Sequence, residues 1–414
     1  MDNLGLMFIS ILDSFKETPQ GKEADSILRT CVHCGFCLAT CPTYQLLGDE
    51  LDSPRGRIYL MKQMFEGQDV TEKTQLHLDR CLTCRACETT CPSGVKYGRL
   101  VDIGRGYVES RVRRGFAATL KRKALAAALP KPSIFKLALK LGQLAKPLLP
   151  GMLQKKIPQS QPPQTWPAPR HARKMLVLDG CVQPTLEPNI NAATARVLDR
   201  LGISLIKSDQ AGCCGAVAYH LNQQADGLDY MRRNIDAWWP FVESGVEAIV
   251  MTASGCGTTV KEYGHMLHDD PIYSKKAAHV SALTKDISEI ITAEADGFEK
   301  LIEPQKKTHQ KIAYHPPCSL QHAQKLKGIV EPLLVKMGYE LTPVPDSHLC
   351  CGSAGTYSLL QPALSQRLLK NKIDNLNLGK PTLIATANIG CQSHIQTATQ
   401  LPVRHWIELV AECL

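Results

Sequence analysis

Short apolar runs recur through the C-terminal half of the chain, and each run is followed within a few residues by a cysteine. Runs of this length that are rich in Val, Ile and Leu are typical of buried strands. Between them, the segments 191–202 and 321–338 show the three- and four-residue apolar spacing of helices. This alternation predicts α/β modules with parallel sheets, in which ligands lie beyond the carboxyl ends of the strands. We therefore expect the cysteines to meet at that edge of each sheet.

The same half of the chain is an internal repeat. Its cysteines recur at intervals of 137, 137, 137 and 135 residues, and the string QAGCCGAVAY returns as SHLCCGSAGTY. We infer two copies of one cysteine-rich module, at 175–300 and 301–414. Their cysteines are Cys181, Cys213, Cys214 and Cys256 in the first copy, matched by Cys318, Cys350, Cys351 and Cys391 in the second.

Two further cysteine runs, at 31–42 and 81–92, each have the spacing C-x₂-C-x₂-C-x₃-C-P. In this pattern three thiolates from one tight turn reach three irons of a cubane, and the fourth cysteine ligates the other cluster. Four-cysteine zinc sites use paired C-x₂-C knuckles instead. The segment 53–67 between the runs predicts a helix, so we expect a helical ferredoxin-type domain over 1–110. Cluster 1 would be bound by Cys31, Cys34, Cys37 and Cys91, and cluster 2 by Cys81, Cys84, Cys87 and Cys41, both as [4Fe–4S] clusters.

A basic connector, 111–174, joins this domain to the modules. It contains fifteen Lys or Arg residues and no Asp or Glu, and the net charge of +9 comes from it. Apolar residues between Ile134 and Leu148 form one face of a predicted helix, with Lys136, Lys140 and Lys146 away from that face. Two placements stay open for the apolar face: an anionic membrane surface, or packing on this chain or a partner subunit. Binding of nucleic acid by the connector is supported only by its charge, since no recognition motif accompanies it, and we expect none.

Composition narrows the class of protein further. The 17 cysteines come without an export signal, which indicates metal or redox chemistry in a reducing cytoplasm. No stretch approaches 18 uninterrupted apolar residues, so we expect no membrane span. There is no G-x-G-x-x-G motif, Walker loop or acid–base pair beside a nucleophile, so we expect no catalytic residue and no cofactor besides the clusters. We therefore expect one partner to donate electrons to this chain and another to accept them from it.

Longer strings carry a resemblance that covers nearly the whole chain. The stretches EADSILRTCVHCGFCLATCPTYQLLGDELDSPRGRIYL, HLDRCLTCRACETTCPSGV, AGCCGAVAYH, NIDAWWP and PDSHLCCGSAGTY resemble the iron–sulfur subunit of bacterial glycolate oxidase, also called glycolate dehydrogenase. The resemblance implies an electron-transfer subunit in a complex with two flavoprotein-type subunits. Those partners would hold FAD and oxidise glycolate to glyoxylate, and this chain would pass the electrons towards a quinone-type acceptor. The free thiols predict a cytoplasmic location, and the basic connector leaves the inner membrane surface as an open possibility.

The modules resemble the CCG cysteine-rich domains of heterodisulfide reductases, with one departure. Those domains end in C-x-x-C, whereas here Thr259 and His394 stand at the last position, which leaves four thiols in each module. Other open assignments are the iron–sulfur subunit of a lactate or glycerol-3-phosphate dehydrogenase and a heterodisulfide reductase-like enzyme. The fold class we expect is α+β multidomain: a helical ferredoxin-like domain followed by two repeated α/β modules.

Overall fold

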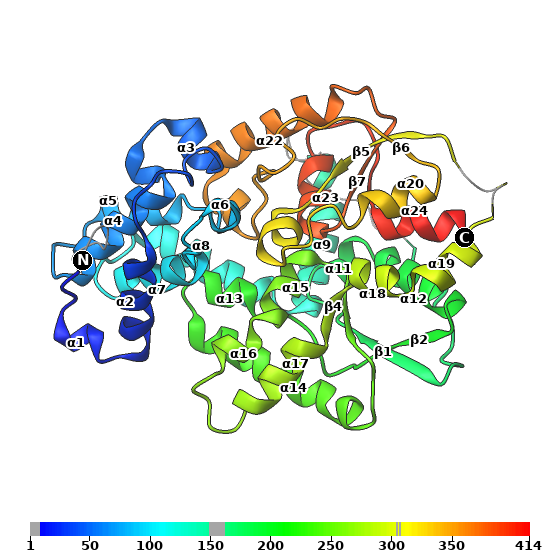
Figure 1. Cartoon of the computed structure of the whole chain (residues 1–414), viewed down its shortest axis with the longest axis horizontal. Coiled ribbons are helices and arrows are strands. Elements are labelled where there is room, and N and C mark those ends of the chain that lie inside the picture. Colours follow the sequence, from blue (N-terminus) through cyan, green and yellow to red (C-terminus); the bar gives the residue numbers. More distant parts are fainter. Residues whose placement is uncertain (1–8, 149–161, 304, 306–307) are drawn as a thin grey trace, which may run out of the picture.

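The computed structural model describes residues 9–148, 162–303, 305 and 308–414. Figure 1 shows three bodies: a helical N-terminal domain, a first module and a second module, with the N-terminal domain against both modules. The contacts between them are specific. Arg85 and Arg99 of the N-terminal domain pair with Glu262 of the first module, each at 3.0 Å. The Tyr357 hydroxyl of the second module donates to the Arg80 carbonyl at 3.1 Å.

The N-terminal domain is built from short helices around one apolar core. The rings of Phe15, Phe65 and Tyr107 pack together with centroids 4.7 to 5.0 Å apart. The helix predicted over 53–67 is confirmed as α4, which begins at a Ser53 cap and a proline. The elements are α1 (Asp13–Lys16), α2 (Pro19–Thr30), α3 (Pro42–Leu47), η1 (Glu50–Asp52), α4 (Pro54–Phe65), α5 (Glu72–Asp79), α6 (Ala86–Thr90) and α7 (Tyr97–Glu109).

The connector begins with two helices, α8 (Phe116–Ala128) and α9 (Pro132–Ala145), followed by the 3₁₀ turn η2 (Lys146–Leu148). Helix α8 is tied to the N-terminal domain by Arg122, 3.1 Å from Asp79, and to the second module by Lys121, which donates to the Leu359 carbonyl. Helix α9 contains the apolar face predicted from Ile134 onwards, and it buries none of its residues. The remaining connector residues up to 161 lie outside the described ranges.

Each module has a four-stranded parallel sheet with the same strand order, β2-β1-β3-β4 in the first and β6-β5-β7-β8 in the second. The central pairs are in register at Leu176 and Ile249, and at Ile312 and Leu383. Side chains from both sheets share one apolar core that includes Ile203, Ile312 and Trp406. The strands are β1 (Arg173–Val177), β2 (Ile203–Lys207), β3 (Ile249–Met251), β4 (Thr284–Asp286), β5 (Lys311–His315), β6 (Glu340–Leu341), β7 (Leu383–Thr386) and β8 (Val403–His405).

Helices cover these sheets as the alternating pattern predicts, with one exception. The prediction over 191–202 is confirmed by α12 (Asn189–Arg200), but the single helix predicted over 321–338 is wrong. A π-helical turn, η4, ends at Ala323, and α20 begins at Glu331. Lys325 and Gly328 between them have left-handed backbones, which a right-handed helix cannot contain. The module helices are α11 (Gln183–Leu186), α12, α13 (Ala216–His220), α14 (Gln224–Glu243), α15 (Ser254–Lys261), α16 (Tyr263–Met266), α17 (Ser274–Leu283), α18 (Ile287–Ala293), α19 (Ala295–Leu301), η4 (Ser319–Ala323), α20 (Glu331–Lys336), α21 (Tyr357–Leu360), α22 (Pro362–Asn377), α23 (Ile389–Gln396) and α24 (Trp406–Cys413).

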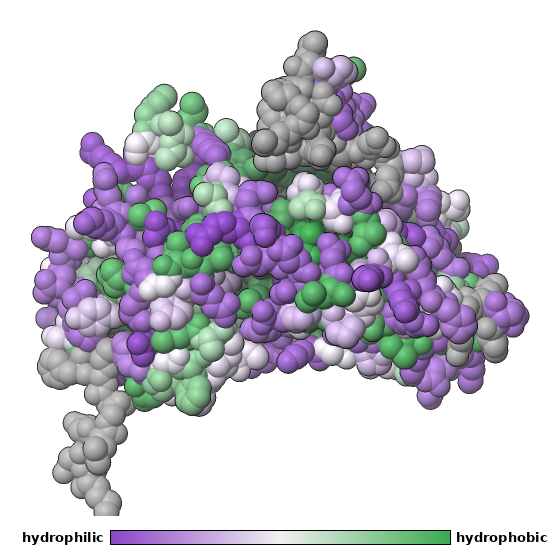
Figure 2. Space-filling view, turned by 90° about the horizontal axis from the view of Figure 1, so that it is seen from above, coloured by the Kyte–Doolittle hydropathy of each residue, from purple (hydrophilic) through white to green (hydrophobic). Residues whose placement is uncertain are grey.

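The surface in Figure 2 is mostly hydrophilic, with apolar residues in small separate groups. Within the described ranges, every helix is too short or too polar to cross a bilayer.

Candidate iron–sulfur centres and cysteine-rich sites

The two N-terminal cysteine runs fold into loops of the same backbone shape. In each loop, the second and fourth residues after the first cysteine have left-handed backbones, and three of these four residues carry side chains that disfavour this conformation. Such residues turn successive backbone N–H groups towards one side, which suits an anionic group. The Thr83 N–H, for example, donates to the Cys81 sulfur at 3.3 Å. The left-handed residues are His33 (φ 54°), Gly35 (φ 85°), Thr83 (φ 53°) and Arg85 (φ 59°).

The first loop closes around a cavity of about 430 Å³. It is lined by the thiols predicted for cluster 1: Cys31, Cys34 and Cys37 from the loop, and Cys91 from the second run. Among these four cysteines, Cys34 is exposed to solvent. Val32 and Phe36 beside it are 50% and 63% exposed, so an apolar rim surrounds this end of the cavity.

The second loop closes around a cavity of about 300 Å³. It is lined by the thiols predicted for cluster 2: Cys81, Cys84 and Cys87, and Cys41 from the first run. Cys87 lines both cavities, as Tyr97 does, so the two cavities share a wall. The structure therefore brings the eight cysteines together in the two cross-paired groups that the spacing predicts, and the ligand assignment remains a prediction that this geometry supports.

A buried polar network that sequence reasoning missed lies under the second cavity. The guanidinium of Arg57, 1% exposed, lines the cavity and is 3.2 Å from the carboxylate of Asp52. Arg80 and His77 also bind Asp52, at 2.7 and 3.1 Å. Burial alone would lower the pKa of Arg57, but Tyr97, Cys81, Cys41 and Asp52 raise it. Arg57 therefore stays cationic, and a buried cation favours an anionic cluster.

The donor chemistry of both cavities fits iron–sulfur clusters. Burial raises the pKa of the Cys37 thiol to about 11, and it raises the pKa of Cys84 and Cys87 well above the ordinary value. Buried thiols of this kind need metal to hold them as thiolates. Polar groups already face the sulfurs: the Tyr97 hydroxyl donates to the Cys81 sulfur at 3.7 Å, and the Thr43 hydroxyl lies 3.3 Å from the Cys41 sulfur. Such bonds to sulfur tune the potential of a bound cluster.

The second module covers cluster 2 with its own thiols. Cys318 and Cys350 share one apolar group with Leu82 and Cys84 of the cluster 2 loop. After burial, the largest influence that raises the pKa of Cys84 is Cys318. The side chains of Thr89 and His322 also meet across this boundary at 3.0 Å. A row of sulfurs thus leads from cluster 2 into the second module.

The four thiols of the first module converge at the carboxyl edge of its sheet, as predicted. Cys213 lies within hydrogen-bond reach of both Cys181 and Cys214, and Cys214 within reach of Cys256. These neighbouring thiols, with the Gly215 N–H and Arg233, lower the pKa of Cys213. The first module therefore favours one thiolate held by its neighbours.

The four thiols of the second module also converge. The sulfurs of Cys318 and Cys350 are 3.8 Å apart, and hydrogen bonds continue the row through Cys351 to Cys391. His394, which stands where a fifth cysteine would be, instead meets the Ser365 hydroxyl at 3.1 Å. Sequence reasoning missed one group here: His315, which ends β5 against Cys351 and Cys391. Comparison of the repeats would have found it, since the corresponding residue of the first module is Leu178.

Comparison with known protein families agrees with this arrangement. Residues 27–95 match the family described as a 4Fe-4S dicluster domain, and residues 175–261 and 312–396 match the cysteine-rich CCG domain. The N-terminal domain is thus an iron–sulfur domain of the two-cluster type, and the CCG unit occurs twice, as the repeat predicts.

Curated relatives match over the full length. The chain is 56% identical to the glycolate oxidase iron-sulfur subunit of Escherichia coli, over 99% of both chains. It is 30% identical to the probable glycolate oxidase iron-sulfur subunit of Bacillus subtilis, over 92% of this chain and 90% of that one. A lactate utilization protein A of Bacillus licheniformis is 26% identical over 52% of this chain and 87% of its own length. The chain therefore belongs to the glycolate oxidase iron–sulfur subunits, a family of oxidoreductase subunits.

Proposed function

We propose that this chain carries electrons from flavoprotein-type partner subunits, which oxidise glycolate to glyoxylate at FAD, through clusters 1 and 2 towards a quinone-type acceptor. When bound, the clusters supply one-electron transfer. The chain's own residues position the clusters, exclude water from cluster 2 and present cluster 1 to a partner. The glycolate substrate follows from the family, and the two partner subunits follow from the same resemblance.

The observation that carries this proposal is the pair of thiol-lined cavities that share Cys87 and Tyr97 as a wall. Clusters in cavities that share a wall lie close enough to exchange electrons directly. The two ends of this pair differ, because cluster 1 reaches the surface at Cys34 whereas the second module covers cluster 2. The apolar rim of Val32 and Phe36 makes the cluster 1 end suitable for docking an electron-transfer partner.

The test is anaerobic reduction of the purified complex by different 2-hydroxyacids, read from bleaching of the iron–sulfur absorbance. Glycolate should bleach the complex faster than lactate or glycerol 3-phosphate, and the isolated chain should not respond to any of them. Robust glycolate oxidation by this chain alone, without flavin, would refute the relay. Faster bleaching by lactate or glycerol 3-phosphate would transfer the assignment to one of the other dehydrogenases.

The docking rim can be tested by a pair of surface variants. Phe36→Ser should slow reduction of the clusters by the partner subunits about tenfold, which corresponds to about 1.4 kcal/mol, because it removes exposed apolar area at the rim. Leu378→Ser is the matched control, since Leu378 is 64% exposed in the second module. Equal rates for both variants would place the partner elsewhere.

We further propose that α9 holds the complex at the cytoplasmic face of the inner membrane. Its residues Leu137, Leu141 and Leu144 are 59%, 58% and 78% exposed, so the described part of this chain does not cover them. Lys136 and Lys140 are exposed on the same helix. A helix with an exposed apolar face and basic residues fits an anionic lipid surface, at about 1 kcal/mol for each basic residue. Such placement would bring the clusters near a membrane quinone.

Co-sedimentation of the complex with liposomes tests this placement. Binding should require anionic lipid, weaken at high salt and fall when Lys136 and Lys140 are both changed to Gln. Binding that ignores lipid charge and salt would instead assign the apolar face of α9 to a partner subunit.

A further inference from the structure

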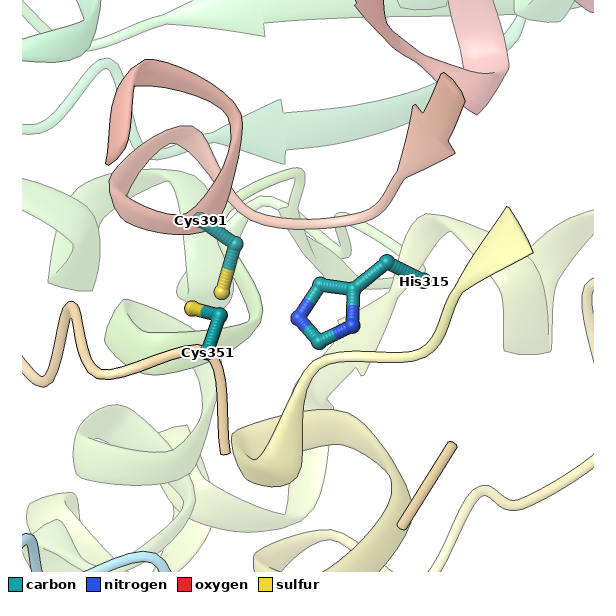
Figure 3. Close-up of side chains that lie close together, drawn as sticks. All are labelled: His315, Cys351 and Cys391. Atoms are coloured by element: carbon teal, nitrogen blue, oxygen red, sulfur yellow. The ribbon is translucent and has the colours of Figure 1, made fainter. Parts of the chain in front are cut away.

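The second module contains a buried histidine, His315, beside two of its cysteines. His315 ends β5 and is fully buried, and neither ring nitrogen has a hydrogen-bond partner among the described residues. Buried polar groups are nearly always hydrogen-bonded, so an imidazole without partners needs an explanation. Figure 3 shows its ring pointing towards the sulfurs of Cys351 and Cys391.

The three side chains form a tight group. One ring nitrogen of His315 and the sulfurs of Cys351 and Cys391 all lie within 4.8 Å of one another, and all three residues are buried. Around a tetrahedral zinc ion, donor atoms at bond lengths of about 2.0 to 2.3 Å would be roughly 3.5 to 3.8 Å apart. Small side-chain movements are therefore enough to close the group around one ion.

This geometry differs from that of the cluster cavities. Within the described part of the chain, the thiols that line the two cavities form no group as tight as this one. Those thiols instead border larger spaces of about 300 and 430 Å³, which are partly open to solvent. The compact set of one imidazole and two thiols suits a single ion.

Hydrogen-bond donors and one buried cation face the sulfurs of these two cysteines. The side-chain amide of Asn388 donates to the Cys391 sulfur at 3.6 Å, and the backbone N–H of Ser353 donates to Cys351. The ammonium of Lys372, in a side chain only 2% exposed, lies near both sulfurs and donates to the Asp346 carbonyl at 2.8 Å. Such donors and a nearby cation would stabilise the two sulfurs once a bound metal ion has displaced their protons.

We propose that His315, Cys351 and Cys391 bind one zinc-type divalent ion, mononuclear and separate from clusters 1 and 2. His315 supplies a neutral imidazole nitrogen, and the two thiols give up their protons to solvent when the ion binds. Cys350, hydrogen-bonded to Cys351, is the nearest further thiol. The first module has no such site, because Leu178 occupies the place of His315.

The test is the metal content of the purified full-length chain or complex, measured for zinc and iron together. We expect one zinc for each chain in addition to the cluster iron. His315→Leu should remove the zinc and leave the iron unchanged, and it should fold because the first module accommodates leucine at this position. Cys413→Ser is the matched control, since Cys413 is a buried thiol whose recorded polar partner is Tyr339. It should keep the zinc.

Zinc-edge X-ray absorption of the unaltered protein gives a second readout that does not depend on a variant. It should show at least two sulfur ligands and one histidine nitrogen. The proposal fails if His315→Leu retains the zinc, or if the unaltered protein binds none. It also fails if His315→Leu removes iron instead, since the residues would then serve a further cluster.

Discussion

The two cysteine-rich modules share a strand order and four thiols, but they differ in what faces those thiols. In the first module, Leu178 extends the apolar core to the cysteine edge, whereas the second module places His315 there. The first module also meets the N-terminal domain through ion pairs at Glu262, while the second lays Cys318 against Cys84 of cluster 2. One scaffold thus presents four thiols beside an apolar side chain in one copy and beside an imidazole in the other.

What the copies retain is the backbone around the paired cysteines. Gly215 and Gly352 follow the pairs with φ of 92° and 89°. A β-carbon on Gly215 would lie 2.6 Å from the Gly227 carbonyl oxygen in α14, and one on Gly352 would lie 2.7 Å from the Ser365 carbonyl oxygen in α22. Two requirements are thus separate. The turn at Gly215 or Gly352 positions the paired thiols, and the side chain that faces them, Leu178 or His315, decides what they can bind.

The largest expected effect concerns cluster 2, the neighbour of the second module. Cys41→Ser should damage the cluster held by Cys81, Cys84 and Cys87 and abolish dye reduction by the complex, because cross-ligation requires Cys41 there. Spectroscopy of the anaerobic variant measures which cluster remains. Cys91→Ser is the matched variant and should damage cluster 1 instead. If Cys41→Ser spared cluster 2 and lost cluster 1, the ligand pairing would be wrong.

The shared backbone can be tested by Gly215→Ala and Gly352→Ala. Each should destabilise its module by about 2–5 kcal/mol, from the left-handed backbone and from the clash with the carbonyl oxygen. Thermal unfolding of the full chain measures the loss. Gly180→Ala is a useful control, because its φ is also positive but a β-carbon there has no neighbour within 4 Å, so the loss should be smaller. Equal losses would mean that the close approach is unimportant.

The difference between the modules can be reversed by Leu178→His. This change puts an imidazole opposite Cys214 and Cys256, which correspond to Cys351 and Cys391. Without metal it should cost about 1–3 kcal/mol, because the buried ring has no partner. Added Zn²⁺ should restore stability and raise the zinc content by one. Leu178→Met is the control: it keeps an apolar side chain of similar volume, so it should change neither the stability nor the zinc content. Destabilisation that zinc does not relieve would show that the thiols of the first module are differently arranged.

The smallest effect is expected at the contact of the first module with the N-terminal domain. Burial tends to raise the pKa of Glu262, but Arg85 and Arg99 outweigh it and lower the pKa. The contact therefore contributes stability at neutral pH that is lost as the pH falls through the lowered pKa. Glu262→Gln should weaken it by about 1–2 kcal/mol at neutral pH, seen as faster hydrogen exchange in α15 and α16. The surface pair of Glu299 and Lys336 offers a control, because Glu299→Gln should change little.

The sequence predicted the parts of this molecule that have strong periodic signals. The intervals between cysteines revealed the repeat, and the apolar runs located β1, β2, β3, β5, β6 and β7. The edge strands β4 and β8 were missed, since TKD and VRH are too short and polar to differ from loop residues. The break in 321–338 depends on local left-handed backbone at Lys325 and Gly328, which overrides helical spacing.

The candidate sites divide in the same way. The eight cysteines of the cluster cavities could be grouped from spacing alone, because the ligand pattern is local to each run apart from one exchanged residue. The network of Asp52, Arg57 and His77 could not, since it joins residues that are unremarkable in sequence and meet only through the fold. His315 lies between these cases. Its difference from Leu178 in the other repeat can be read from the sequence, but its burial against Cys351 and Cys391 cannot.

The cover over cluster 2 has a consequence for how the protein is made. The ribosome releases Cys84 more than 200 residues before Cys318 and Cys350, which later enclose it. During synthesis the cluster 2 loop is therefore open to iron–sulfur delivery, and docking of the second module ends that period. Cluster 1, with Cys34 still at the surface of the folded chain, stays accessible until a partner docks there. We therefore expect cluster 2 to be rebuilt more slowly than cluster 1 after oxidative damage, because the second module must first move away from it.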